Sequence, residues 1–573
     1  FFCWLQSRTI SPLPRRQPSH THAPMLTYTP PSHPELPKPT EKPWLLLLLC
    51  FVWLWPGILG HGPWKPDEPY AVGVVQWMLH SGDWLTPRIA GEPYLDTPPL
   101  YYWVAALFAR LLSPWLLPLH DAARLATPLF MSLTLLFVGM TARELIGRRH
   151  GRSAVLILIG CLGLIDTGHQ LSADVAILCA EAACLLGLTL ALRRGFLGAL
   201  ALALGSTALM LSASVVELAL VWMTAAMLPA FCGWRSRQYV KTITIALALG
   251  APLVLMWPMS MAKHQPELFA QWWHSLALGP FYGFGRFALL HDFGYYLRLL
   301  PWFAWPAWPL AAWAVWRGRE RLSSTRYQLP LVLVLMNLLM LMLSPRQNPV
   351  YALPLLLPLA VLAAVELDTL KRGAAAFFNW FGIFTLGLAG VLVWLGWTAM
   401  NFGWPAKLAA KAVKYSPSYE AQIHVLPLLL ALAMSLAWGW AVTRRRLMGR
   451  QAVTNWALGM TLLWSLAGTL WLPWLDAQKG YHMVMHSLRA SLPAQLDSCV
   501  ASAPGNQLPR AMAYYYVNLP LLNSETVQGH SCRYRLISTP EANYQPEGPW
   551  KMLWRGARPA EKREFYVLLK RQD

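Results

Sequence analysis

Apolar runs of membrane-spanning length recur along most of this 573-residue chain and constrain its fold more than any other feature. Each run is close to the ~20 residues that an α-helix needs to cross the hydrocarbon layer of a membrane. Hydrophobic residues make up 56% of the chain and charged residues only 13%, which is unlike the composition of a soluble protein. The sequence therefore predicts a polytopic α-helical membrane protein.

The net charge of +20 does not indicate nucleic-acid binding, because many of the basic residues are grouped between apolar runs. Such groups face the cytoplasm in membrane proteins. We place these basic groups there: 148–152, 193–194, 235–241, 317–326, 371–372, and 444–446 with Arg450. Two apolar passes separate each neighbouring pair, which gives an alternating topology.

This alternation predicts about thirteen spans, and an odd number puts the two ends of the chain on opposite sides. They cover roughly 44–60, 121–146, 153–170, 174–192, 196–211, 213–232, 240–262, 299–317, 327–343, 349–367, 374–400, 425–442 and 453–473. The apolar run at 100–118 is not counted, because a span there would put the basic group at 148–152 outside. Arg110 and Trp115 favour a helix on the outer surface instead.

The topology divides the chain into three parts. Residues 1–42 are rich in Pro, Ser, Thr and His without a long apolar run, which predicts disorder. Residues 43–475 form the transmembrane part, which includes a long outer loop at 61–118. Residues 476–573 are polar and mixed in composition, which predicts a small α/β domain outside the cytoplasm.

Within this last part, the runs at 514–517 and 565–569 are rich in aromatic and aliphatic residues and are predicted to be buried strands. Cys499 and Cys532 lie in the same part. Outside the cytoplasm they can form a disulfide, and two free thiols are the alternative.

The outer loop at 61–118, with surface helices expected at about 67–81 and 99–112, concentrates acidic residues. Asp67 and Glu68 open it directly after a span. A carboxylate there can act as a general base or stabilise a developing cation at a sugar carbon, and Glu68 is predicted to bind substrate beside it. The alternatives are an acidic pair at a helix N-terminus and a solvated linker.

Other charged residues are functional candidates as well, and Asp174 is expected to face the same outer layer of water. Asp174 stands where two spans meet, and we expect it to share a site with Asp67, although a helix N-cap is the alternative. Glu217 is predicted to lie in the middle of a span, where an acid is a functional candidate. Arg346 lies in a short outer loop, against the usual charge pattern. Phosphate binding would explain it, and a snorkelling side chain is the alternative.

Three motifs follow the acidic pair: Ser-Gly-Asp-Trp at 81–84, Gly-Glu-Pro-Tyr at 91–94 and Pro-Pro-Leu-Tyr-Tyr-Trp at 98–103. In this combination the chain resembles the membrane glycosyltransferases of the aminoarabinose transferase type. These are related to the protein O-mannosyltransferases and share the GT-C fold. The resemblance is dense over about 67–103 and looser beyond, through Asp174, Tyr351 and the C-terminal part.

The resemblance implies that a sugar moves from a polyprenyl-phosphate carrier to an acceptor, a lipid A phosphate or another envelope glycan. The reaction would take place at the periplasmic face of the bacterial inner membrane, with inversion at the sugar carbon. Besides donor and acceptor, membrane lipids are the expected partners. A transporter or flippase of lipid-linked sugars is the competing class, and a protein O-glycosyltransferase is a further alternative. No internal repeat supports a transporter.

The resemblance also assigns residues. By motif position Asp67 matches the family's essential first-loop Asp, and Asp174 matches the second acid. Tyr94 matches a Tyr beside the site. Asp96 falls where the family usually has a metal-binding Glu, and His274 lies roughly where a His ligand is expected. A divalent metal, zinc or magnesium, is therefore expected, although no close ligand spacing supports it.

Two positions depart from the family's pattern. The family often has a Lys at the position of Thr97, where it would meet the carrier phosphate, and an Arg at the position of Tyr70. Either Arg88, Arg286 or Arg346 is expected to supply the missing positive charge, or the donor and acceptor differ.

Overall fold

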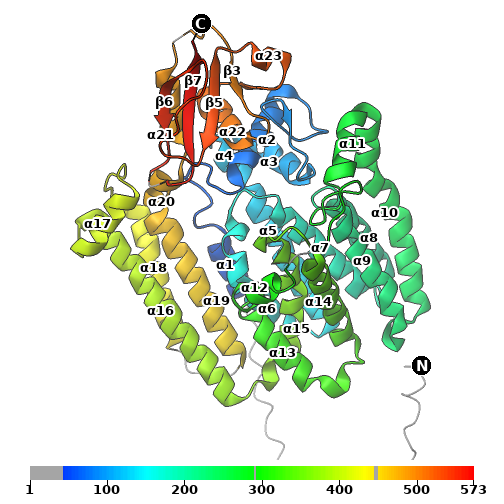
Figure 1. The fold of residues 1–573 in the computed structure, drawn as a ribbon. Helices are drawn as coiled ribbons and strands as arrows, with labels where there is room; N and C mark the ends of the chain where they lie inside the picture. Colours follow the sequence, from blue (N-terminus) through cyan, green and yellow to red (C-terminus); the bar gives the residue numbers. More distant parts are fainter. Residues whose placement is uncertain (1–42, 290–291, 444–448, 494, 560, 573) are drawn as a thin grey trace, which may run out of the picture.

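The computed structural model describes residues 43–289, 292–443, 449–493, 495–559 and 561–572. Long helices form most of the molecule, and a small sheet lies at one end of them (Figure 1). The expectations for residues 1–42 and for the basic group at 444–446 lie outside the described residues.

The helices follow from the apolar runs. They are α1 (Pro43–Leu54), α2 (Glu68–Ser81), α3 (Leu100–Leu112), α4 (Leu119–Arg124), α5 (Ala126–Leu145), α6 (His150–Ile159), α7 (Asp174–Leu190), α8 (Gly195–Met210), α9 (Val215–Met227), α10 (Arg237–His264), α11 (Pro266–Ser275), α12 (Tyr295–Phe303), α13 (Ala307–Arg317), α14 (Thr325–Leu343), α15 (Leu356–Val365), α16 (Arg372–Phe402), α17 (Ala406–Tyr415), α18 (Val425–Val442), α19 (Gly449–Leu466), α20 (Leu472–Lys479), α21 (His482–Ser491), α22 (Gln507–Val517) and α23 (Val527–His530).

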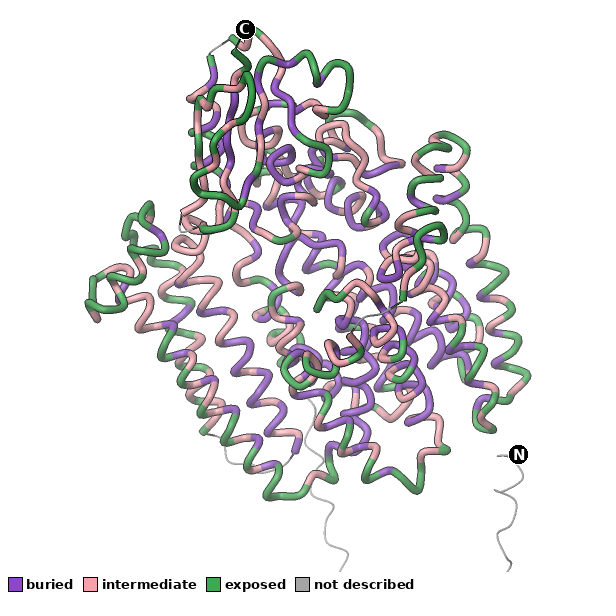
Figure 2. The backbone as a smooth tube through the Cα atoms, viewed as in Figure 1, coloured by how far each residue is buried: buried purple, intermediate pink, exposed green. Residues whose placement is uncertain are grey.

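Many of these helices suit a membrane. Among the described residues, six continuous helices are long and apolar enough to cross one, or up to seven when a pair bent by 66° at 150–169 counts as one span. Shorter apolar helices accompany them, such as Gly195–Met210 and Pro349–Val365. The long helices α10, α16 and α18 expose one side to the surroundings (Figure 2). The prediction of a helical membrane protein is thereby confirmed.

The first outer loop folds as expected into two helices. α2 and α3 match the predictions for 67–81 and 99–112 within a few residues. α2 ends at Gly82, whose φ of 72° requires the left-handed backbone that glycine adopts without strain. A short hairpin of β1 (Arg88–Ile89) and β2 (Glu92–Pro93) connects the two helices.

The C-terminal part forms a five-stranded sheet in the order β4-β3-β5-β7-β6. Its strands are β3 (Val500–Ser502), β4 (Leu521–Asn523), β5 (Tyr534–Thr539), β6 (Trp550–Gly556) and β7 (Phe565–Arg571). β3 pairs in parallel with β4 and β5, whereas β7 runs antiparallel to β5 and β6. The strand predicted at 565–569 lies within β7, so that prediction is confirmed.

The strand predicted at 514–517 is wrong, because these residues end the helix α22. The tyrosines have a local preference for strands, but Leu508, Ala511 and Met512 recur at helical spacing and are buried. Ala511 packs closely against Gly73 of α2, where an added Cβ would come within 2.8 Å of it. Tertiary packing therefore overrides the local preference.

Two kinds of link hold this sheet and its helices in place. Cys499 and Cys532 form a disulfide between the segments before β3 and β5, as the sequence allowed. Lys65 of the first outer loop bonds Glu564 at 2.5 Å, and Asp476 accepts a hydrogen bond from the Gly62 N–H at 2.8 Å. The chain entering α2 is thus attached to the C-terminal part.

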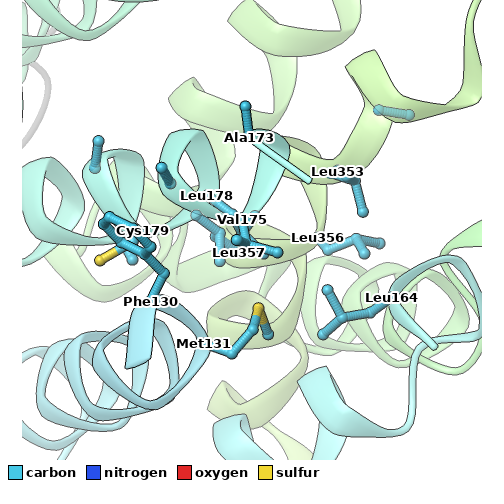
Figure 3. Packing of buried hydrophobic residues seen from close by; sticks show 14 of the residues in the cluster. Phe130, Met131, Leu164, Ala173, Val175, Leu178, Cys179, Leu353, Leu356 and Leu357 are labelled. Atoms are coloured by element: carbon cyan, nitrogen blue, oxygen red, sulfur yellow. The ribbon is translucent and has the colours of Figure 1, made fainter. Parts of the chain in front are cut away.

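The apolar core beneath the first outer loop is built from α5, α7 and α15. Figure 3 shows Phe130 and Met131 of α5 beside Val175 of α7 and Leu356 of α15. Ala173 lies at the edge of this core (Figure 3), and the next residue, Asp174, begins α7 and lines a cavity.

Candidate active site

A cavity of about 250 Å³ lies where the first outer loop meets the start of α7. Its walls come from segments far apart in the sequence. The predicted site residues that line it are Asp67, Tyr94, Asp96, Asp174, Arg346 and Tyr351, and Thr97 lines it with them. The structure therefore brings both predicted catalytic acids and one predicted phosphate-binding cation into one space.

Asp67 and Asp174 are linked through Ser172. The Ser172 hydroxyl lies 2.6 Å from Asp174 Oδ2 and 3.5 Å from Asp67 Oδ2, and its oxygen accepts a hydrogen bond from the Asp174 N–H at 3.3 Å. Burial, and after it the Asp174 carboxylate, raises the pKa of Asp67 to about 7. Asp67 can therefore gain or lose a proton near neutral pH, as a general base requires.

Glu68 does not line the cavity, although it was predicted to bind substrate. Its carboxylate is fully buried and accepts hydrogen bonds from Arg124 Nε at 2.8 Å, the Trp64 N–H at 2.8 Å and the Leu171 N–H at 3.0 Å. Burial by itself would raise the pKa of Glu68, but Arg124 and His61 outweigh it and hold that pKa below its ordinary value. Trp64 lies shortly before Asp67 and Leu171 shortly before Asp174, so Glu68 fixes the backbone that carries both acids.

Arg346 supplies positive charge in the cavity. Its guanidinium lies 4.4 Å from the centroid of the Tyr282 ring, and its carbonyl accepts a hydrogen bond from Tyr296 at 3.2 Å. Across the described part of the chain, no carboxylate forms an ion pair with it. Burial raises the pKa of Asp96, and the charge of Arg346 opposes that rise. Arg346 is therefore positioned to receive an anion.

The two positions that depart from the family's pattern, Thr97 and Tyr70, have polar or aromatic partners. Thr97 lines the cavity, and its hydroxyl shares a hydrogen bond of 2.5 Å with the Tyr102 hydroxyl. Tyr70 stacks on Tyr94, with ring centroids 5.9 Å apart and an interplanar angle of 9°. Neither Thr97 nor Tyr70 carries a positive charge. Of the three arginines predicted to replace it, Arg346 is the one that lines the cavity.

The other predicted cations lie elsewhere. Arg88 donates to the Gly91 carbonyl at 3.1 Å and lies 3.5 Å from Asp83, outside the cavity lining. Arg286 is exposed, and its N–H donates to the Gly283 carbonyl. Neither arginine lines the cavity, and the Arg88 side chain is held within its own loop by these contacts.

Asp96 and His274 do not form a metal site by themselves. Asp96 faces the cavity, whereas His274 is exposed on α11 and does not line it. Within the described ranges, no group of three or more His, Cys, Asp and Glu residues could hold a metal ion. The described residues around Asp96 and His274 do not fit the expected ligand set, and the divalent metal stays a prediction.

The sequence did not single out Ser172, and it misplaced Glu217. Glu217 occupies the third position of α9 rather than the middle of a span, and it lines the cavity. Its carboxylate accepts hydrogen bonds from the Ser214 N–H and hydroxyl, which is a capping box. The Ser-x-x-Glu spacing at 214–217 was the signal that could have placed Glu217 at a helix start. The position of Ser172, two residues before Asp174, could likewise have indicated a bond between them.

Known proteins of similar sequence are transferases. No family model matches the chain. It is 26% identical over 567 residues to the undecaprenyl phosphate-alpha-4-amino-4-deoxy-L-arabinose arabinosyl transferase of Pseudomonas savastanoi, a match that covers 92% of this chain and 98% of the relative. The enzyme of the same name from Edwardsiella ictaluri is 29% identical over 371 residues, covering 62% and 63%.

Solved structures give the fold. The crystal structure of ArnT from Cupriavidus metallidurans bound to undecaprenyl phosphate matches with a TM-score of 0.61 and 16% identity, over 92% of this chain and 96% of that one. Its apo form matches with a TM-score of 0.62. The resemblance predicted from the first-loop motifs is therefore confirmed, and the chain has the GT-C fold.

Proposed function

We propose that this chain, which has the fold of the aminoarabinose transferases, moves a sugar from a polyprenyl-phosphate carrier to a lipid A phosphate or another envelope glycan. One observation carries the proposal: a single cavity holds the carboxyl pair Asp67 and Asp174 together with Arg346. Transfer from a lipid phosphate is assisted by a carboxylate at the acceptor or at the cationic sugar and by a cation at the leaving group. The relatives support a transferase rather than a transporter, flippase or protein O-glycosyltransferase.

Arg346 would bind the carrier phosphate. Its planar guanidinium offers several N–H donors to phosphate oxygens, and no ion pair with a described carboxylate competes for them. Charge builds up on that phosphate as the bond to the sugar breaks, so a fixed cation stabilises the transition state more than the bound substrate. Tyr351, which contacts Arg346, would orient it.

Asp67 would act at the sugar or its acceptor. A hydroxyl acceptor has a proton to lose, and Asp67, with a pKa of about 7, would take it. A phosphate acceptor is already ionised, and Asp67 would then orient it or stabilise the cationic sugar. In either case Asp174 accepts a hydrogen bond from the Ser172 hydroxyl, and its carboxylate raises the pKa of Asp67. Direct attack by the acceptor inverts the sugar carbon.

The charge of the cavity favours a sugar with an amino group. Its walls carry Asp67, Asp96, Asp174 and Glu217 against Arg346. Two ionised carboxylates side by side are unfavourable, and a bound ammonium group relieves that repulsion. This agrees with the amino sugar named for the bacterial relatives.

The topology belongs to the same proposal. Thirteen spans are part of the proposal, and the six long apolar helices, the bent pair and the shorter apolar helices among the described residues support it. The chain would then be a multi-pass protein of the bacterial inner membrane. The first outer loop at 61–118, with the cavity that it helps to form, would face the periplasm, as would the separate domain at 476–573. Residues 43–475 would form the membrane domain.

The proposal is tested by loss of transfer in Asp67→Asn. Purified protein is supplied with polyprenyl-phosphate aminoarabinose and lipid A, and the modified lipid A is measured by mass spectrometry. We expect at least a hundredfold lower rate, since loss of one group that stabilises developing charge costs about 10²–10³-fold. Asp83→Asn, which removes a carboxylate outside the cavity, is the matched control. Undiminished transfer by Asp67→Asn contradicts the role of Asp67, and no transfer by the unmodified chain contradicts the acceptor.

A further inference from the structure

A second, larger cavity lies on the side of the molecule away from the first outer loop. It has a volume of about 920 Å³ and is lined by α1, α18 and α19 and by Arg152 of α6. Along α1 the lining residues are Leu45, Leu48, Leu49 and Val52, which share one helix face. α18 and α19 run side by side (Figure 1). We call this space the α1–α19 groove.

The groove has one charged end. Arg152, Gln451 and Leu45 lie near the first residues of α6, α19 and α1, and Ala441 lies near the last residue of α18. Arg152 and Arg450, which belong to basic groups proposed to face the cytoplasm, lie at these same helix ends. From Gln451 to Ser465 the lining follows α19 for about 21 Å, at 1.5 Å per residue. The groove thus extends from the proposed cytoplasmic surface into the membrane.

Of the described residues that line the groove, Arg152 is the charged one. Among the described residues, no carboxylate lies within ion-pair distance of it, whereas Arg450 nearby is paired with Asp368 at 2.5 Å. The polar side chains beside Arg152 are satisfied within the protein: Gln451 donates to Asn455 at 2.9 Å, and Thr454 donates to the Arg450 carbonyl at 2.8 Å. An apolar slot with one unpaired guanidinium at its mouth is complementary to a lipid with an anionic head.

We propose that the α1–α19 groove binds an anionic phospholipid of the cytoplasmic leaflet, with its phosphate on Arg152 and an acyl chain along Leu48, Val52 and Ala437. The length supports a phospholipid, because ~21 Å matches one leaflet, which is half of the ~30 Å hydrocarbon core plus the headgroup layer. A zwitterionic lipid would leave the guanidinium without a net counter-charge at the mouth. The proposal depends on the topology and not on sugar transfer.

Native mass spectrometry of the full chain tests this site. The protein is released from vesicles that contain phosphatidylglycerol and phosphatidylethanolamine with matched acyl chains, and the bound lipids are counted. We expect wild-type protein to retain phosphatidylglycerol, and Arg152→Gln to retain about fivefold less, which is the effect of one basic residue at an anionic lipid surface. Arg193→Gln, which removes an exposed arginine at the same proposed surface, is the matched control.

A second pair of variants separates the groove from the charge. Ala437→Trp fills the slot and keeps Arg152, so we expect it to lose phosphatidylglycerol as well, whereas Arg152→Lys should retain most of it. Sugar transfer in detergent should stay unchanged in these variants. Equal losses in Arg152→Gln and Arg193→Gln, full retention in Ala437→Trp, or equal binding of both lipids overturns the proposal. Displacement of phosphatidylglycerol by an equal amount of a polyprenyl phosphate also overturns it and assigns the groove to the carrier lipid.

Discussion

At the scale of single residues, the chemistry of the candidate site depends on one shared hydroxyl group. Ser172 bonds Asp174 at 2.6 Å and approaches Asp67 at 3.5 Å, but its single proton serves only one of them at a time. The carboxyl group without that proton is the less stabilised anion. Burial and the neighbouring Asp174 carboxylate raise the pKa of Asp67 to about 7, and the distant Ser172 hydroxyl opposes that rise.

The first prediction concerns pH. Because Asp67 must be ionised to act, kcat/KM should fall as the pH drops below about 7, where the carboxyl gains a proton. In Asp174→Asn the neighbouring negative charge is gone, so the pKa of Asp67 falls and the acid limb of the profile should move to lower pH. Measured pH–rate profiles of both proteins test this. An acid limb that stays in place would show that another group controls it.

The second prediction concerns the carrier phosphate. Arg346→Gln removes the unpaired guanidinium from the cavity, and we expect kcat/KM for the lipid-linked donor to fall by 10²–10³-fold, which is typical for loss of one group that stabilises developing charge. Arg286→Gln, an exposed arginine outside the cavity lining, should have little effect. Equal effects of the two variants would remove Arg346 from the proposed site.

At the scale of elements, close helix contacts set the position of α7, which carries Asp174. Small residues allow this contact: a Cβ on Gly187 of α7 would come within 2.6 Å of the Leu202 backbone of α8. Helices in membranes depend on such close packing, since lipid supplies no hydrophobic drive to bring them together. The candidate site is therefore sensitive to a position that lies well inside α7.

The third prediction follows from this contact. Gly187→Ala should force α7 and α8 apart and destabilise the protein by about 1–3 kcal/mol, the usual cost of overpacking. The measurement is the midpoint of thermal unfolding in detergent. Gly373→Ala on α16 is the control, because a Cβ there meets nothing within 4 Å. A midpoint for Gly187→Ala that matches this control would show that α7 and α8 can relax.

At the scale of the whole molecule, the C-terminal part and the first outer loop form one body around the cavity. The Lys65–Glu564 ion pair joins residues 499 positions apart, and α22 packs on α2. The disulfide Cys499–Cys532 fixes the sheet that carries these contacts. Damage to the sheet should therefore reach the first outer loop.

The fourth prediction tests that dependence. Cys499→Ser removes a cross-link between residues 33 positions apart, which should cost the C-terminal part about 3–4 kcal/mol. We expect faster proteolysis of residues after 480 and a lower transfer rate, both measured on the full chain in detergent. Cys161→Ser replaces a free buried thiol and is the control. Unchanged proteolysis would show that the sheet is stable without its cross-link.

What the sequence determined by itself is local. Runs of apolar residues specify membrane helices, and the pattern at 67–112 specified α2 and α3, because helix period and length are properties of neighbouring residues. The first-loop motifs also singled out Asp67, which lines the cavity. These features depend on residues that are close in the chain.

Only the tertiary structure decided which charges meet. Glu68 and Arg124 are 56 positions apart, and their pairing removed Glu68 from the cavity that holds its neighbour Asp67. Arg346, rather than Arg88 or Arg286, reached that cavity. Packing between distant segments sets these distances, and electrostatic interactions depend on distance and burial rather than on position in the sequence. The same packing made 514–517 the end of a helix despite its strand-like composition.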